Sequence, residues 1–298
     1  MPAAPASPAL VGPVTEWFAE HARDLPWRRP GTSAWAVLVS EVMLQQTPVS
    51  RVLPAYRAWL ERWPGPAELA ADEPGEAVRM WGRLGYPRRA LRLHACAIAI
   101  TEQHGGRVPA ELPALLALPG VGAYTARAVL AFAYGRRAAV VDINVRRVLA
   151  RAVSGLGMPA PPATNRDLAT LERLLPMQDA VAARFCAGLM ELGALVCTAG
   201  QPACGGCPVR ELCAWRLAGF PRYEGPVSRP QRFAGTDRQV RGLLLTVLRA
   251  SAEPVSQASL DVVWPDAGQR RRAQNSLVAD GLIYPLPDGR LALPGSSG

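Results

Sequence analysis

The sequence contains no lysine. All 33 basic residues are arginine, and they outnumber the 24 acidic residues, so the formal net charge is +9. Without lysine, no side-chain amine is available for Schiff-base catalysis. The excess of positive charge predicts a polyanionic partner such as nucleic acid.

Two further features are missing. No apolar run approaches the roughly 18 residues that a membrane-spanning helix needs, so we expect no membrane partner. The first residues, Met1 to Pro5, have neither the basic start nor the apolar stretch of a secretion signal, which predicts a cytoplasmic protein. Apolar residues make up 49% of the chain, enough for a sizeable core.

The spacing of apolar residues is helical over most of the chain. It recurs from Val14 to Leu217, whereas strand-like alternation is nearly absent before residue 280. Loops with Pro or Gly lie at residues 63–66, 105–106 and 155–157. We predict an all-α fold with a flexible tail over 1–12, a helical body over 13–218 and a linker over 219–235.

Residues 236–298 are predicted to form a small C-terminal module. Three helical patterns are followed by two short apolar strands around an Asp288-Gly289 turn, an order that resembles a winged helix. The run Arg270 to Arg272 near the start of the third helix is compatible with phosphate contact and, equally, with an ordinary solvated helix face.

Four of the six cysteines lie within 17 residues, with the spacing C-x6-C-x2-C-x5-C: Cys197, Cys204, Cys207 and Cys213. In a chain without a secretion signal, such a group indicates metal binding before disulfides. A structural zinc site usually shows two C-x2-C pairs, and only one is present. Because an iron–sulfur cluster needs a larger cage, the uneven spacing favours 4Fe-4S, with zinc as the alternative. Cys96 and Cys186 fit apolar helix faces.

A Gly-rich turn and a downstream aspartate form the second motif. The segment Leu118-Pro-Gly120-Val121-Gly122 precedes a helix, so its backbone amides can bind phosphate. Some 20 residues later, Asp142 begins another helical pattern, where it suits an N-cap as well as a functional carboxylate.

Glu41 lies in an almost wholly apolar helical pattern, residues 35–44. A carboxylate there is costly unless it is paired or protonated, and burial should raise its pKa. The pattern favours a general acid/base in an apolar pocket over a satisfied core or surface Glu.

Taken together, these motifs resemble the MutY-type adenine glycosylases of the helix-hairpin-helix, endonuclease III superfamily. The likeness covers roughly residues 13–217 and includes the segments 25–28, 40–47, 85–86 and 190–194. It implies a two-lobe body, with a helical barrel from about 25 to 135 and a cluster lobe made of the N-terminal helix plus 136–217. It also implies a monomer that binds double-stranded DNA containing an adenine mispair, with the adenine flipped out of the stack.

The resemblance implies roles for matched residues. Glu41 would protonate adenine N7 and help activate water, and Asp142 would stabilise the oxocarbenium-like sugar. Tyr124 occupies the position of the catalytic lysine in lyase relatives. The base pocket would be lined by Trp27, Arg28 and Glu191. Gln46 and Tyr86 would wedge into the stack and read the opposite base, and DNA contacts would come from Gln45, Gln46, Thr47, Tyr86, Leu118, Gly120, Val121, Gly122 and Arg146.

The sequence departs from the family pattern at two places. The first cluster loop, residues 198–203, lacks the basic residues that many relatives place on phosphates. Residues 236–298 are too few for the nudix-like domain with which many members read 8-oxoguanine. We predict a monofunctional glycosylase for adenine opposite 8-oxoguanine or guanine. A glycosylase for thymine or uracil opposite guanine is the alternative, and an iron–sulfur winged-helix regulator a remote one.

The absence of lysine gives a first testable prediction. Borohydride treatment during base removal should trap little or no covalent protein–DNA adduct, because no lysine can form an imine with the sugar. The adduct would be measured by gel shift under denaturing conditions. A strong adduct would assign imine chemistry to the N-terminal amine and contradict a purely hydrolytic mechanism.

Overall fold

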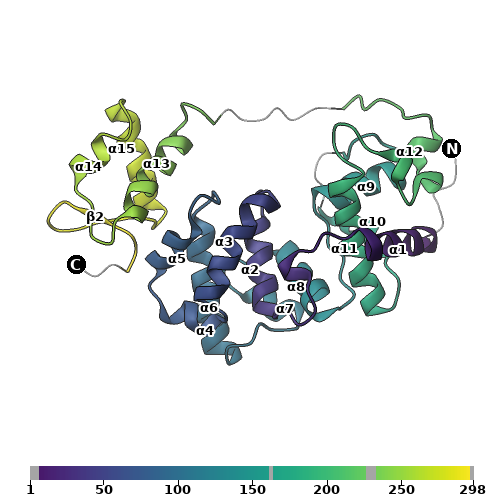
Figure 1. Ribbon diagram of the computed structural model, residues 1–298, viewed down its shortest axis with the longest axis horizontal. Helices are drawn as coiled ribbons and strands as arrows, with labels where there is room; N and C mark the ends of the chain where they lie inside the picture. The colour runs from purple at the N-terminus through teal and green to yellow at the C-terminus, as the bar shows by residue number, and fades with distance from the viewer. Residues whose placement is uncertain (1–6, 161–163, 226–232, 296–298) are drawn as a thin grey trace. The chain divides into compact units, whose positions relative to one another are not determined.

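A computed structural model of the chain describes residues 7–160, 164–225 and 233–295 (Figure 1). Parts of the predicted tail and linker, residues 1–6 and 226–232, lie outside the described residues. Short 3-10 helices occur at Ser7–Leu10, Pro26–Arg28, Cys204–Gly206 and Arg210–Leu212. The elements are α1 (Val11–His21), α2 (Ala34–Leu44), α3 (Val49–Arg62), α4 (Pro66–Ala71), α5 (Pro74–Trp81), α6 (Arg88–His104), α7 (Leu112–Ala117), α8 (Ala123–Tyr134), α9 (Ile143–Ala152), α10 (Thr164–Leu174), α11 (Asp179–Leu195), α12 (Ala214–Leu217), α13 (Asp237–Ala250), α14 (Gln257–Asp261), α15 (Ala267–Ala279), β1 (Tyr284–Pro285) and β2 (Leu291–Ala292).

The all-α prediction is confirmed, since the described residues contain only one two-stranded sheet. Helices α1 to α12 occupy most of the part of the chain, Val14 to Leu217, in which the apolar spacing is helical. The sequence analysis missed α4, because Pro64-Gly65-Pro66 suggested a loop. Pro66 is instead the first residue of that helix, where proline's fixed φ is favourable and its missing N–H costs nothing.

The chain divides into two compact units. The first comprises Met1–Val37, Ala110–Leu116 and Gly122–Val227, and the second comprises Leu38–Pro109, Ala117–Val121 and Ser228–Gly298. This division differs from the two lobes expected at 25–135 and 136–217. The reason is that α8 packs on α11, with Ala128 and Ala131 in the core of the first unit.

The core of the first unit lies between α1, α9 and α11, which gather with α10 and α12 in Figure 1. Val14 and Trp17 on α1 and Phe185 and Leu189 on α11 are buried at helical spacing, so each helix turns one apolar face inward. Leu10 is also buried there, which shows that the chain joins the body before the end of the predicted tail at residue 12.

Three tryptophans form the centre of the second unit. The rings of Trp59 and Trp63 lie 4.6 Å apart and those of Trp59 and Trp81 lie 5.7 Å apart, both edge to face. Such edge-to-face pairs are favoured by the ring quadrupole, at about 0.5–1.5 kcal/mol each beyond their burial. They join α3 to α5, and both α4 and α5 pack on α6.

The C-terminal module shows the predicted order of elements, with α13, α14 and α15 followed by an antiparallel pair of strands. Within it, Arg270 donates to the Trp264 carbonyl and faces Asp261, while Arg272 faces Asp237 at 3.5 Å. These two arginines therefore have partners inside the module. The winged-helix identity and the phosphate contacts stay predictions.

Within the described ranges, every helix is too short or too polar to cross a membrane.

Candidate DNA-binding and catalytic site

Glu41 lies on α2 in the second unit, between apolar neighbours. Its side chain is 5% exposed, and Ser40 beside it is fully buried. The burial expected from the sequence is therefore observed. A buried carboxyl group on an apolar helix is a candidate for a functional acid or base.

Two residues predicted to read the opposite base have unusual backbone conformations. Gln46 and Tyr86 have φ angles of 55° and 46°, in the left-handed region that residues other than glycine rarely adopt. Both side chains are exposed, and Tyr86 is 50% exposed. Strain of this kind persists only when the surrounding structure holds it in place, and it is concentrated at functional sites.

A buried arginine that the sequence analysis missed holds both loops. Arg89 on α6 donates to the carbonyl of Gln45 at 2.6 Å and to that of Gly85 at 3.2 Å. Its guanidinium also lies 5.4 Å from the Tyr86 ring. Buried Thr47 adds a bond of 3.1 Å to the Leu84 carbonyl. Burial lowers the pKa of Arg89, because removal from water disfavours the charged guanidinium.

The Gly-rich turn has the geometry that its sequence predicts. Leu118 and Val121 are buried and anchor the turn, which the Val121 amide closes by donating to the Leu118 carbonyl at 3.1 Å. Gly120 has φ +76°, and a Cβ there would lie 2.7 Å from the Cβ of Arg92. Gly122 is exposed and precedes α8 as its N-cap. Exposed amides at a helix start can bind a phosphate.

Asp142 caps α9 in the first unit, as its position in the sequence predicts. Its Oδ1 accepts a hydrogen bond of 2.7 Å from the Val145 amide, and its Oδ2 accepts one of 2.7 Å from the Asn144 side chain. Burial raises the pKa of Asp142, while these donors and the charge of Arg147 oppose that rise. One carboxylate thus serves as a helix cap and as a partly desolvated negative charge.

Hydrogen bonds connect Asp142 to the cysteine loop. Arg147 donates to the Asn144 side chain at 2.7 Å, to the Gly193 carbonyl at 2.6 Å and to the Cys197 carbonyl at 2.6 Å. A Cβ on Gly193 would lie 2.7 Å from that of Asn144, so only glycine lets α9 and α11 approach this closely. The sequence analysis missed Asn144 and Arg147, although both lie within five residues of Asp142.

The four cysteines of the motif line one cavity in the first unit, together with Arg151 and Trp215: Cys197, Cys204, Cys207 and Cys213. Arg151 lies 3.4 Å from the Cys197 sulfur and 4.8 Å from the Trp215 ring. Among the described residues, no group of three metal-ligating side chains is arranged for a single ion. Four partly buried thiols beside a cation fit an anionic cluster bound by thiolates.

The residues predicted to line the base pocket also lie in the first unit. Glu191 is fully buried and binds Arg23 through both oxygens, at 2.8 and 2.7 Å, and Arg28 at 3.0 Å. Burial alone would raise the pKa of Glu191, but the hydrogen bonds from Arg23 and Arg28 outweigh it and lower that pKa to about 2. Glu191 therefore orients Arg28, and its contact with a base stays a prediction.

One nitrogen of the Arg28 guanidinium is not used in hydrogen bonds within the described part of the protein. Its Nη1 atom is buried and has no hydrogen-bond partner among the described residues, although Nη2 is bound to Glu191. The guanidinium lies 5.4 Å from the Phe18 ring, and Trp27 beside it is 7% exposed. A buried donor without a partner costs free energy unless a ligand satisfies it.

Two other predicted residues have contacts within the first unit. Tyr124, near the start of α8, is partly buried and packs against the core. Arg146 forms an ion pair with Asp167 at 2.7 Å and donates to the Ala160 carbonyl at 2.7 Å. Because its side chain is only 13% exposed, contact between Arg146 and DNA requires rearrangement and stays a prediction.

Two family models match the chain. One, the HhH-GPD superfamily of base excision DNA repair proteins, matches residues 39–173, and the other, the iron–sulfur binding domain of endonuclease III, matches residues 197–213. An adenine DNA glycosylase of Mycolicibacterium smegmatis is 58% identical over 94% of both chains, and one of Mycobacterium tuberculosis is 52% identical over 97% of both. The solved structure of a thermostable thymine-DNA glycosylase is 27% identical, with a TM-score of 0.63 over 70% of this chain and 96% of that one.

The cysteine site predicts a yellow-brown protein with about four irons per chain after anaerobic purification, measured by metal analysis and visible absorbance. Cys204→Ala should lose most of this iron, because it removes a ligand. Cys96→Ala is the matched control and should keep it, since Cys96 lies in the core of the second unit. Zinc in place of iron would contradict the assignment.

The Glu191 contacts predict a pH-dependent contribution to stability. The pKa of this carboxyl group falls from an ordinary value near 4.5 to about 2 on folding. The ionised carboxylate therefore contributes fully to the free energy of unfolding above about pH 4.5, and this contribution disappears as the pH falls through 2. At about 1.4 kcal/mol per pKa unit, Glu191→Gln should lower the free energy of unfolding at neutral pH by up to about 3 kcal/mol.

Denaturant unfolding of both proteins, loaded with the same amount of iron, would measure this difference at several pH values. Glu20→Gln on α1 is the control, because the Glu20 side chain is 76% exposed. A difference between wild type and Glu191→Gln that stayed constant down to pH 2.5 would contradict the assigned pKa.

Proposed function

The chain belongs to the HhH-GPD superfamily of base excision DNA repair proteins, and we propose that it is a monofunctional adenine DNA glycosylase acting on adenine opposite 8-oxoguanine or guanine in duplex DNA. Full-length identity of 52–58% to adenine DNA glycosylases supports adenine as the base removed. The structural observation that carries the proposal is the buried carboxyl group of Glu41. The protein would act as a monomer on DNA in the cytoplasm.

Glu41 acts first, as a general acid. Its carboxyl proton moves to N7 of the flipped adenine, so that the base leaves as a neutral molecule when the N-glycosidic bond breaks. Water then attacks C1′ of the sugar and transfers a proton to the Glu41 carboxylate, which restores the acid. The burial of Glu41 suits this exchange, because it keeps bulk water away from the transferred proton.

Asp142 stabilises the positive charge that develops on the sugar. Its oxygens are fixed by the Val145 amide and the Asn144 side chain, so little reorganisation is needed when the charge appears. As the N-cap of α9, the Asp142 carboxylate is held in place by hydrogen bonds and needs no lysine beside it. The absence of lysine favours hydrolysis to an abasic site without strand cleavage.

Arg28 supplies recognition in the base pocket. Its buried Nη1 donor can bind an acceptor atom on the base, while Glu191 holds the other side of the guanidinium. Gln46 and Tyr86, fixed in strained conformations, read the opposite base, and the amides of the Gly120 turn bind the DNA backbone.

The iron–sulfur cluster would be held by the four cysteines and would supply a rigid, charged element beside Arg151. Arg147, four residues before Arg151 on α9, donates to Asn144, which donates to Asp142. In this proposal the cluster orders the loop and takes no part in the hydrolysis.

A second candidate is removal of thymine or uracil opposite guanine, because the thymine-DNA glycosylase structure shares the fold at 27% identity. The two candidates differ in the need for an acid. Adenine leaves readily only when protonated on the ring, and Glu41 offers that proton.

Base removal by wild type and Glu41→Gln should be measured in single turnover on duplexes with adenine, thymine or uracil opposite guanine, and adenine opposite 8-oxoguanine. We expect wild type to release adenine, and Glu41→Gln to lose at least about 100-fold of that rate with little change in DNA affinity, because it removes the acid.

Glu61→Gln is the matched control, since Glu61 is exposed on α3 and should not affect the rate. Adenine release by Glu41→Gln near the wild-type rate would show that another group is the acid. Release of thymine or uracil without adenine would establish the second candidate instead.

A further inference from the structure

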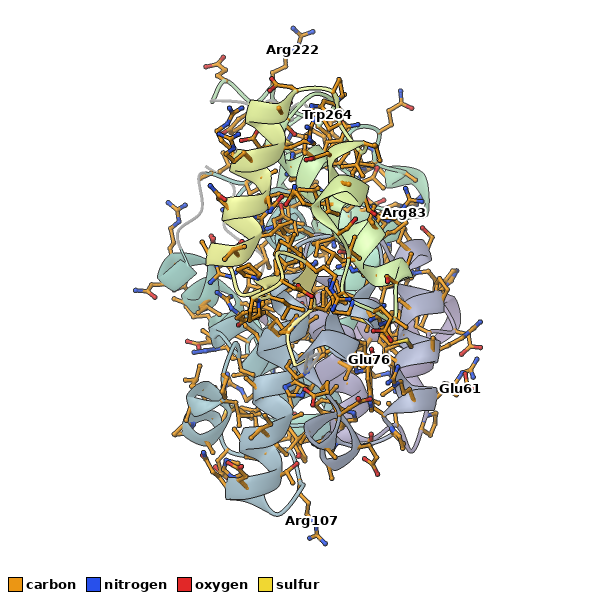
Figure 2. All side chains as sticks on the ribbon, turned by 90° about the vertical axis from the view of Figure 1, so that its left-hand side faces the viewer. Glu61, Glu76, Arg83, Arg107, Arg222 and Trp264 are labelled. Carbon is orange, nitrogen blue, oxygen red and sulfur yellow. The ribbon has the colours of Figure 1, made fainter. Side chains whose placement is uncertain are left out.

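The C-terminal module and helix α5 of the same unit cap each other's C-terminal ends through two arginines. Arg249 on α13 donates to the carbonyls of Val78 and Gly82, at 2.8 and 2.5 Å. In the opposite direction, Arg79 on α5 donates to the carbonyls of Arg249 and Ser251, at 2.5 and 2.6 Å. The last carbonyls of a helix lack intrahelical partners, so cations suit both positions. Figure 2 labels Glu76 on α5 and Trp264 in the module.

Gly82 begins the loop that ends at Tyr86, and every main-chain carbonyl in it accepts a hydrogen bond. Arg249 donates to the first of these carbonyls, that of Gly82. The partners of the other four come from the body of the unit: Arg51, Thr47, Trp81 and Arg89. The module therefore completes the set of contacts that fixes this loop.

The module also holds the chain directly after the loop. Asp280, which follows α15, forms an ion pair of 3.2 Å with Arg88, two residues beyond Tyr86. Arg241 on α13 binds the other Asp280 oxygen at 2.5 Å and so orients the carboxylate. One contact of the module thus lies four residues before Tyr86, and another lies two residues after it.

This bracing matters because of the conformation of Tyr86. A left-handed backbone is unfavourable for an aromatic residue, and Gly82 and Gly85 have φ angles of 53° and 84°. The two glycines adopt positive φ without steric cost, so the strain lies at Tyr86, which keeps its conformation only while the surrounding structure fixes the loop. Burial lowers the pKa of Arg249 to about 10, which shows that its charge is substantially desolvated at this contact.

We propose that Arg249 and Asp280 are positioning residues for Tyr86, through which the C-terminal module sharpens discrimination of the base opposite adenine without touching that base. The inference rests on the proposed function, because it assigns the module to the loop that carries the opposite-base reader. Replacing either residue should free one flank of the loop and leave the Glu41 chemistry in place.

The test is the ratio of single-turnover rates for adenine opposite 8-oxoguanine and adenine opposite guanine. We expect Arg249→Met to lower this ratio about fivefold, as for loss of a charged hydrogen bond, and Asp280→Asn to lower it by a smaller factor. Arg249→Lys should recover part of the ratio, because its amine can still reach one carbonyl. Asp288→Asn is the matched control, since Asp288 pairs with Arg290 inside the hairpin.

The same substitutions made together with Tyr86→Ala separate positioning from general destabilisation. In that background Arg249→Met and Asp280→Asn should leave the ratio unchanged, because the residue that they position is gone. If they still lower it, the module acts elsewhere and the inference is wrong. If Arg249→Met fails to fold, Asp280→Asn and Arg249→Lys carry the test.

The two proposals fail in different ways. A wild-type protein that releases no adenine from any duplex overturns the proposed function. If wild type releases adenine and prefers one opposite base, and Arg249→Met and Asp280→Asn have the same ratio, the proposed function stands. The proposed role of the module is then wrong.

Discussion

Hydrogen bonds from buried and half-buried arginines to main-chain carbonyls hold the segments that carry the site. Arg89 joins the loops of Gln46 and Tyr86, Arg147 joins the Asp142 helix to the cysteine loop, and Arg249 joins the module to α5. The guanidinium suits this task because its donors point in several fixed directions and it keeps its charge when desolvated. Lysine, with one nitrogen and a readily shifted pKa, does neither as well.

Burying these charges is costly, and the cost limits how the chain can rearrange. Burial lowers the pKa of Arg89, Arg147 and Arg249 alike. Removing one carbonyl partner would leave part of a desolvated guanidinium without an acceptor, so these contacts favour a narrow range of loop conformations. Strained residues such as Tyr86 persist for this reason. The same rigidity is what a glycosylase requires, since its catalytic groups must be in place before charge develops on the sugar.

Asp142 and Glu191 show how burial acts differently on two carboxyl groups of one unit. Desolvation prevails at Asp142, where the donors are neutral groups and a more distant arginine, and its pKa is raised. At Glu191 two arginines bind directly, and the pKa falls to about 2. Among the described residues, no arginine is bound directly to the Asp142 carboxyl group, which can interact with positive charge that forms nearby. The Glu191 carboxylate is already paired with Arg23 and Arg28 and holds them in place.

Features that depend on spacing along the chain could be predicted from the sequence: helical periodicity, the four-cysteine motif, the Gly120 turn, the Asp142 cap and the burial of Glu41. These follow from local geometry, because a helix repeats every 3.6 residues and a cap acts within one turn. Contacts between residues far apart in sequence depend on the three-dimensional fold and could not be predicted, such as Arg89 with Gln45, Glu191 with Arg23, and Arg249 with Gly82. The fold also decided that α8 packs on α11. The physical reason is that an arginine fits the local helical spacing whether it ends on the surface or beneath a loop, and packing against distant segments decides which of these occurs.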